Sequence, residues 1–263
     1  MFESISRNAK MYLASQKYKL RRFFIYRMQA FTWLIAFMLG STYQIVVATI
    51  IYTSSSGING WTYYQMLALG GLANIFAGIM LFTLSPHNLG RLMRNGQLDQ
   101  WLIKPYNPIL MLLSITGSVS ALGSVIVGIA TLSFALIMAK ISIFSLSAML
   151  AIFIIGAIDV VLFELLVVLA SYVLFRSSNF VQWIFNIGKN AVSYPLSIYG
   201  IAGLVLFTVV MPIGLATFFP AEALFSKIET STLAFAIALE IIFMYAYYKA
   251  SAWLLTKYSS GGG

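Results

Sequence analysis

Six long apolar segments dominate this sequence and limit what it can fold into. A helix of about 20 apolar residues is long enough to cross a bilayer, and a helix satisfies its own backbone hydrogen bonds inside lipid. Only 9% of the residues are charged, whereas soluble domains carry about 25%. The short alternating strands of a membrane barrel are missing from the sequence. The sequence therefore predicts an all-α polytopic membrane protein with six transmembrane helices. We place these helices at about residues 23–52, 61–84, 109–138, 144–175, 195–218 and 232–255.

The first 22 residues are polar and basic, and their apolar side chains recur at helical spacing. This pattern predicts an amphipathic helix over residues 1–22 that lies in the membrane interface, with a disordered basic tail as the alternative. The stretch has no apolar segment of the kind that a cleavable signal peptide needs, so we expect the first span to direct insertion. We expect residues 1–258 to form one transmembrane domain, and 259–263, Ser-Ser-Gly-Gly-Gly, to be a linker added for expression.

Basic residues gather at one end of the predicted helices. Six spans place both termini on the same side, and of the 16 Lys and Arg residues all but Lys140 and Lys227 fall on that side. Because basic residues are enriched in cytoplasmic loops, we expect the termini and the loop between the second and third spans to be cytoplasmic. The same bias explains the net charge of +9 without a nucleic-acid partner. The chain has no cysteine, which excludes disulfides and thiol chemistry.

Two predicted spans carry small or polar residues at every fourth position, a spacing that lets helices approach closely. These positions are Gly70, Asn74 and Gly78 in the second span and Ser120, Ser124 and Gly128 in the third. We expect them to form helix contacts rather than a ligand site. In the fifth span, Pro212 predicts a kink or break. Residues 177–193 show the spacing of a short interfacial helix.

Residues 85–108, SPHNLGRLMRNGQLDQWLIKPYNP, form a polar, basic and turn-rich loop between the second and third spans. Ser85 and Pro86 are a helix-start signal, with the serine as cap and the proline in the first turn. Asn95-Gly96 favours the end of that helix. A second short amphipathic piece follows and ends at Pro105. The loop therefore predicts two short helices at the cytoplasmic end of the bundle.

The second piece of this loop carries three apolar side chains, Leu98, Trp101 and Leu102, among polar neighbours. Exposing them to water without a partner or lipid would be unfavourable. We therefore interpret the loop as a docking surface for a soluble partner, with a solvated connector as the alternative. In this interpretation the three apolar residues fill a groove of the partner, and charged residues of the loop fix its orientation.

The loop also resembles the signature loop of one branch of ABC-2-type transporter permeases. In residues 95–108 the matching pattern is a Gly, a Leu-Asp pair, a Leu, a basic residue, a Pro and a second Pro shortly after. A second similar region includes Tyr194-Pro195, Met211-Pro212 and Phe219-Pro220-Ala221. With six spans and landmarks in this order, the resemblance extends over nearly the whole chain.

The resemblance implies a half-transporter, in which two identical or related permease chains pair in the membrane. Each chain docks on a cytoplasmic ABC ATP-binding subunit through the loop, and the pair exports a hydrophobic or amphipathic compound such as a drug, lipid or peptide. Residues 220–229 would form a re-entrant hairpin, with Pro212, Pro220 and Glu222 at its bends. We expect the cell membrane of a prokaryote as the location. The residues that would couple the loop to the ATPase are Arg91, Arg94, Gly96, Leu98, Asp99, Trp101, Leu102, Lys104 and Pro105.

The sequence lacks the GxxxxGK[ST] loop that holds nucleotide phosphates. We therefore expect no catalytic residue, metal site or cofactor on this chain, with ATP and Mg²⁺ bound by the partner subunit. The lone histidine, His87, is expected to be a solvated residue at a helix start.

Three acids, Asp159, Glu164 and Glu240, fall inside predicted spans. A carboxylate in lipid is costly unless it pairs, protonates or faces water, so these acids are candidates for a translocation path or a helix interface. Asp159 and Glu164 are about 140° apart around a helix and do not share a face.

The acids also leave open an ion-coupled secondary transporter that works without ATP. Two further alternatives are an intramembrane lipid enzyme that uses His87 or a buried carboxylate, and an assembly subunit without a transport path.

Overall fold

The computed structural model describes residues 2–54, 60–139, 141–175, 188, 190–227 and 230–259, and every regular element in these ranges is a helix. Five helices are long and apolar enough to cross a membrane, and a sixth span is complete if one sharply bent pair is counted as one. The prediction of an all-α polytopic membrane protein is confirmed. The predicted interfacial helix at 177–193 lies largely outside the described residues.

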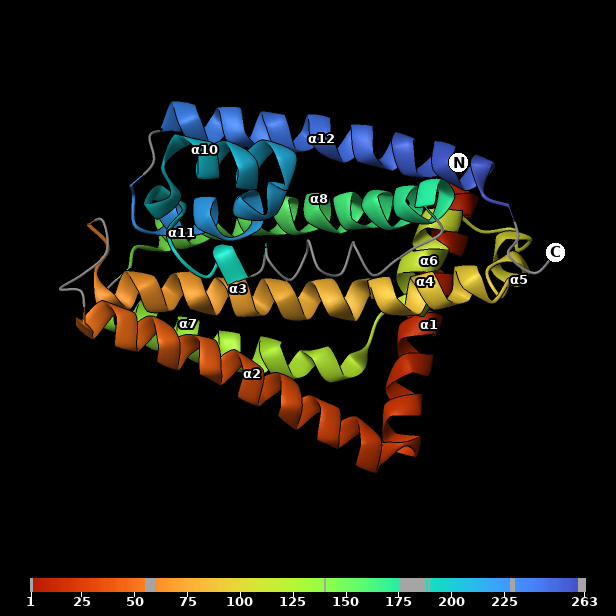
Figure 1. The fold of residues 1–263 in the computed structure, drawn as a ribbon, viewed down its shortest axis with the longest axis horizontal. Helices are drawn as coiled ribbons and strands as arrows, with labels where there is room; N and C mark the ends of the chain where they lie inside the picture. The colour runs from red at the N-terminus through yellow and green to blue at the C-terminus, as the bar shows by residue number, and fades with distance from the viewer. Residues whose placement is uncertain are drawn as a thin grey trace.

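The first helix lies across the bundle rather than along it (Figure 1). Helix α1 covers Phe2–Ile25, and a turn at Tyr26 separates it from α2, Arg27–Ser54. The amphipathic N-terminal helix therefore extends a few residues past the predicted boundary at 22. Lys19 of α1 donates a hydrogen bond to the Phe82 carbonyl (3.3 Å), and burial lowers the pKa of Lys19 to about 8. This contact ties α1 to the end of the second span.

The second span is α3, Tyr63–Thr83, and it packs along α7, Leu122–Ala139. Thr62 starts α3 with a capping box, because its hydroxyl accepts from the Gln65 N–H (3.4 Å) while the Gln65 side chain accepts from the Thr62 N–H (3.0 Å). The predicted small-residue contacts are present on one face. A Cβ on Gly128 would lie 2.7 Å from the Gly71 carbonyl oxygen, and one on Gly78 would lie 2.9 Å from that of Ala121. Gly70 has open space around it, so the contacting glycine is Gly71.

The third span is broken, whereas the apolar pattern predicts one helix over 109–138. A short helix α6, Pro108–Thr116, ends at Gly117, and the chain then continues through η1, Val119–Ala121, into α7. The break is held by α3: Gly117 lies directly against the Phe82 carbonyl, and Ser118 N–H donates to the Leu81 carbonyl (2.9 Å). A side chain at 117 would collide with this backbone, so the position requires glycine.

Two long helices, α8 and α12, run in the same direction side by side (Figure 1). Their bounds are Ile143–Phe175 and Thr230–Lys257. Ring contacts set their register, with centroids 5.2 Å apart for Phe163 and Tyr247 and 5.9 Å apart for Tyr172 and Tyr258. The buried core lies between α8, α3 and the segment that precedes α12.

That segment bends by 81°, which confirms the break predicted at Pro212. It consists of η2, Leu196–Tyr199, α10, Gly200–Val205, the π-helical turn η3, Leu206–Val210, η4, Pro212–Ala216, and α11, Phe218–Leu224. Pro220 is buried inside α11, and Glu222 is half-buried. Beyond α11, Lys227 donates to the Gly60 carbonyl (3.1 Å) and lies over the Trp61 ring (4.1 Å). The predicted hairpin at 220–229 is thus described only as far as Lys227.

Candidate functional site

The loop of residues 85–108 forms the two short helices that its sequence predicts. Helix α4 covers Pro86–Arg94, and α5 covers Asp99–Leu102. The Ser85 hydroxyl accepts from the Asn88 N–H (3.5 Å), and Pro86 occupies the first turn. After α4 the chain turns at Gly96, whose φ of +64° favours glycine. The start, the stop and the turn of this loop therefore follow from local chemistry.

One side of the loop is part of the protein's own core. Leu89, Met93 and Leu98 are all 0% exposed and pack in the buried cluster. Leu98 was predicted to fill a groove of a partner, and this prediction is wrong, because its side chain is already covered by the bundle. Leu102 is half-buried against the same cluster, which leaves only part of it for another contact.

The carbonyl oxygen of Met93, in the last turn of α4, accepts hydrogen bonds from two tyrosines. Tyr172 near the end of α8 donates at 2.9 Å, and Tyr258 just after α12 donates at 3.5 Å. A backbone carbonyl has two lone pairs and can accept both. The end of α4 is therefore connected to both long helices through a single atom.

The exit of the loop is connected in a similar way by Asn107. Its side-chain oxygen caps α6 by accepting from the N–H groups of Ile109 (3.0 Å) and Leu110 (3.2 Å). Its side-chain nitrogen donates to the Tyr248 hydroxyl of α12 (2.9 Å), and its backbone N–H donates to the Asn8 side chain of α1 (3.1 Å). At the loop's entrance, the Asn88 side chain donates to the Thr116 carbonyl of α6 (2.8 Å). The loop is thus fixed to α1, α6, α8 and α12.

The other side of the loop is open and basic. Arg91, Arg94 and Lys104 are exposed, as is Pro105, and the Lys104 ammonium lies 3.9 Å from the centre of the half-buried Trp101 ring. Asp99, in the first turn of α5, is half-buried. We call the exposed side chains on this side, Arg91, Arg94, Gln97, Gln100, Ile103, Lys104 and Pro105, the outer loop face.

The apolar residue at the centre of the outer loop face is Ile103, which is 83% exposed. The sequence analysis missed it, because the amphipathic pattern selected Leu98 and Leu102 on the opposite side of the turn. The available signal was its position: Ile103 directly follows Leu102, and neighbouring residues in a turn point in different directions. Ile103 is thus the large apolar side chain of this face that stays open beside exposed cations.

The three acids of the predicted spans are all buried, at 0% exposure for Asp159 and Glu240 and 1% for Glu164. They lie at the contact of α8 with its neighbours rather than at the loop. Asp159 and Glu240 come close enough for their charges to interact across the contact of α8 with α12. His87, at the start of α4, is exposed as predicted.

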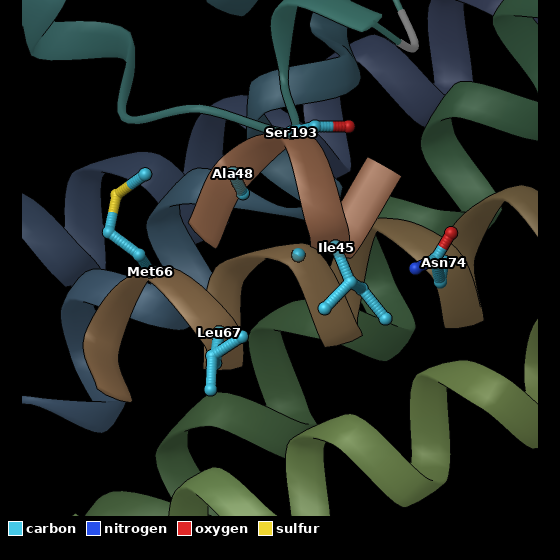
Figure 2. Close-up of a pocket in the computed structure, with 7 residues that line it drawn as sticks. Ile45, Ala48, Met66, Leu67, Asn74 and Ser193 are labelled. Atoms are coloured by element: carbon cyan, nitrogen blue, oxygen red, sulfur yellow. The ribbon is translucent and has the colours of Figure 1, made fainter. Parts of the chain in front are cut away.

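A small pocket of about 10 Å³, room for no more than one water molecule, lies between α2, α3 and the chain near Ser193 (Figure 2). Its lining is apolar except for Asn74 and Ser193, the remaining residues being Ile45, Ala48, Met66, Leu67 and Gly70. The Asn74 side chain is 2% exposed, and its amide nitrogen has no hydrogen-bond partner. A buried amide donor beside a space of this size suits a bound water molecule rather than a larger ligand.

Comparison with protein families gives one match, to the family described as ABC-2 family transporter protein, over residues 38–262. This region includes α4, α5, the bent segment before α12 and all of the spans. The only part of a span that lies outside it is the first turns of α2. Comparisons with curated proteins and with solved structures give no match.

Proposed function

The chain belongs to the ABC-2 transporter family, and from this premise we propose that it is the membrane subunit of an ATP-driven exporter, energised by a separate ATP-binding subunit docked on residues 85–108. The family establishes a multi-pass transport permease. Our proposal adds the direction, out of the cytoplasm of a prokaryotic cell, and the cargo class, a hydrophobic or amphipathic compound. It also adds the assembly, two permease chains with two ATP-binding subunits and with the termini cytoplasmic.

The observation that carries this proposal is the two-sided construction of the loop. Its inner side is buried and hydrogen-bonded to the bundle, while its outer loop face presents Ile103 among Arg91, Arg94 and Lys104. A plain connector has no need of hydrogen bonds to four helices. One exposed isoleucine is ordinary by itself, but beside exposed cations it gives a partner an apolar and a basic contact together. A surface that must receive a force and pass it on needs both properties.

Movement of the partner would reach the spans through the contacts already described. A soluble subunit that grips the outer loop face displaces α4 and α5 together, because Gly96 joins them in one turn. The displacement passes to α8 and α12 through the Met93 carbonyl and to α6 through Asn88. The cavity between two permease chains then changes from inward-open to outward-open.

The test measures recovery of an ATPase with the purified chain. The tagged protein is expressed in its own host and purified from the membrane, and the Mg²⁺-dependent ATPase activity that co-purifies is measured. For Ile103→Glu we expect at least a tenfold loss of recovered activity, because a carboxylate would have to enter an apolar groove, at a cost of about 1.4 kcal/mol or more. Charge reversal by Lys104→Glu should lower it several-fold.

Two matched variants separate docking from general damage. Ile103→Val keeps an apolar anchor and should retain the activity, while Lys17→Glu reverses an exposed charge on α1, outside the outer loop face, and should change little. Normal recovery of a stimulated ATPase with Ile103→Glu would contradict docking at this face. Uptake or release of a compound by the chain alone in liposomes, driven by an ion gradient without ATP, would favour the ion-coupled alternative instead.

A further inference from the structure

The contact between α8 and α12 contains two carboxyl groups that the proposed function does not use. The side of α12 that faces the bundle is a narrow stripe, and its fully buried residues are Ala236, Glu240, Ser251 and Leu254. Asp159 occupies the matching side of α8. Two of the most costly side chains to place in a membrane thus lie on the same contact.

The register of the two helices brings these acids together. Phe163 of α8 contacts Tyr247 of α12. Because the two helices are parallel, Asp159, one turn before Phe163, is level with Phe243, one turn before Tyr247. Glu240 precedes Phe243 by three residues and lies on the same side of α12. The charge of Asp159 acts on both Glu240 and Tyr247, which agrees with this placement.

Both carboxyl groups are sealed and without hydrogen-bond partners. Each side chain is 0% exposed, and none of the four carboxyl oxygens has a hydrogen-bond partner among the described residues. A buried polar group without a partner needs a physical explanation, and a bound ion or water is one. The site is closed, so an ion as small as a proton is the ligand that fits.

Among the described residues, the stretches of α8 and α12 around the pair carry no positive charge. Residues 144–173 of α8 and 230–248 of α12 contain no Lys or Arg. Of the other elements that pack on these two helices, α3, α6 and η4 carry no acid or base apart from Tyr63 and Tyr64 of α3. The charged group of α11 is Glu222, which interacts with Lys227. Helix α4 carries His87, Arg91 and Arg94, which lie at the loop. On α8 itself Glu164 lies about 140° away from Asp159.

We propose that Asp159 and Glu240 form a proton-binding site that controls how firmly the last helix is held against α8. Two neighbouring carboxylates in an apolar contact cannot both stay ionised, so the folded protein keeps at least one proton on the pair. Loss of that proton leaves two like charges facing each other and pushes α12 away from α8.

The site has a direct route to the docking loop. Helix α12 reaches the loop through the Tyr248 bond to Asn107, and the chain just beyond it reaches Met93 through Tyr258. A change in the seating of α12 therefore changes the support of α4 and α6. This consequence rests on the proposed function, whereas the proton site itself does not.

The test uses the purified full chain in lipid nanodiscs and needs no partner. Thermal unfolding is followed at pH values from about 6 to about 9 for the wild type and for Asp159→Asn/Glu240→Gln, which has nearly the same shape but cannot ionise. In the unfolded chain both carboxyl groups are already ionised throughout this range, so the wild type should lose stability as pH rises until the folded pair has lost its proton. Relative to the double variant, which keeps only the slope of other groups such as Lys19, we expect the wild-type melting temperature to fall by roughly 2–4 °C. Asp99→Asn, an acid outside the spans, should keep the wild-type slope.

A second measurement holds even if the double variant folds poorly. Infrared spectroscopy of the wild type at neutral pH should show the carbonyl band of a protonated carboxylic acid, and Glu240→Gln should weaken that band. A wild type without the band, or a double variant with the same pH slope as the wild type, would overturn the proton site. Failure of ATPase docking would leave both measurements unchanged, so the two proposals fail separately.

Discussion

Two helix pairs in this protein pack together through different kinds of contact. Helices α3 and α7 approach so closely at Gly71, Gly78 and Gly128 that backbone lies against backbone. Helices α8 and α12 meet instead through rings and through two carboxyl groups that lack partners. The first contact depends on shape and contains no group that titrates, so its strength does not follow pH. The second depends on a charge state, so it is the contact that can be loosened.

The largest effect should come from adding one methyl group to the glycine contact. In Gly128→Ala the new Cβ would meet the Gly71 carbonyl oxygen and the Ile75 nitrogen, both 2.7 Å away, and neither atom can move without shifting α3. We expect a loss of about 2–3 kcal/mol in the free energy of unfolding, measured by thermal or denaturant unfolding in nanodiscs.

The adjacent glycine of α3 supplies the control. A Cβ on Gly70 has no atom within 4 Å, so Gly70→Ala should change the free energy of unfolding by no more than about 0.5 kcal/mol. Equal losses in the two variants would show that the close approach of α3 and α7 has no special importance.

The second prediction replaces the carboxyl contact by apolar side chains. Asp159→Leu/Glu240→Met removes two groups that must be desolvated and leaves side chains that pack in the same apolar contact. We expect the double variant to be more stable than the wild type by about 1–2 kcal/mol, as found when buried charged groups are replaced in this way. A clear loss of stability in the same unfolding assay would mean that the carboxyl groups themselves hold α12 in place.

The smallest effect concerns the Met93 carbonyl oxygen, where α8 and the chain just beyond α12 both bind α4. Tyr172→Phe removes the 2.9 Å hydrogen bond to the Met93 carbonyl, and the longer bond from Tyr258 stays. We expect a loss of about 1 kcal/mol in the free energy of unfolding, together with a lower ATPase stimulation than in the wild type. Tyr258→Phe removes the weaker bond and should cost less. The reverse order would show that Tyr258 is the main support of α4.

Local signals predicted the parts of the fold that local chemistry decides. The caps of α4, the glycine turn at Gly96 and the break at Pro212 each depend on a few neighbouring residues, and all three are present. The break at Gly117 was missed because its cause, the Phe82 backbone, lies 35 residues earlier in the chain. An apolar run without proline gives no sign of such a contact.

The sequence predicted the docking loop, but it placed Leu98 on the outer face, where the structure has Ile103. Apolar spacing shows that Leu98 avoids water, but it does not distinguish a partner's groove from the protein's own core. Ile103, which stays in water, carried no periodic signal. In the same way the meeting of Asp159 with Glu240 joins positions 81 residues apart, and only the packing of the finished bundle reveals it.

The shared acceptor at Met93 has a consequence for how the loop can move. Its oxygen receives one hydroxyl from α8 and one from the chain end beyond α12. A tilt of α4 therefore strains both bonds together, so α8 and the end of the chain feel the same displacement of the loop.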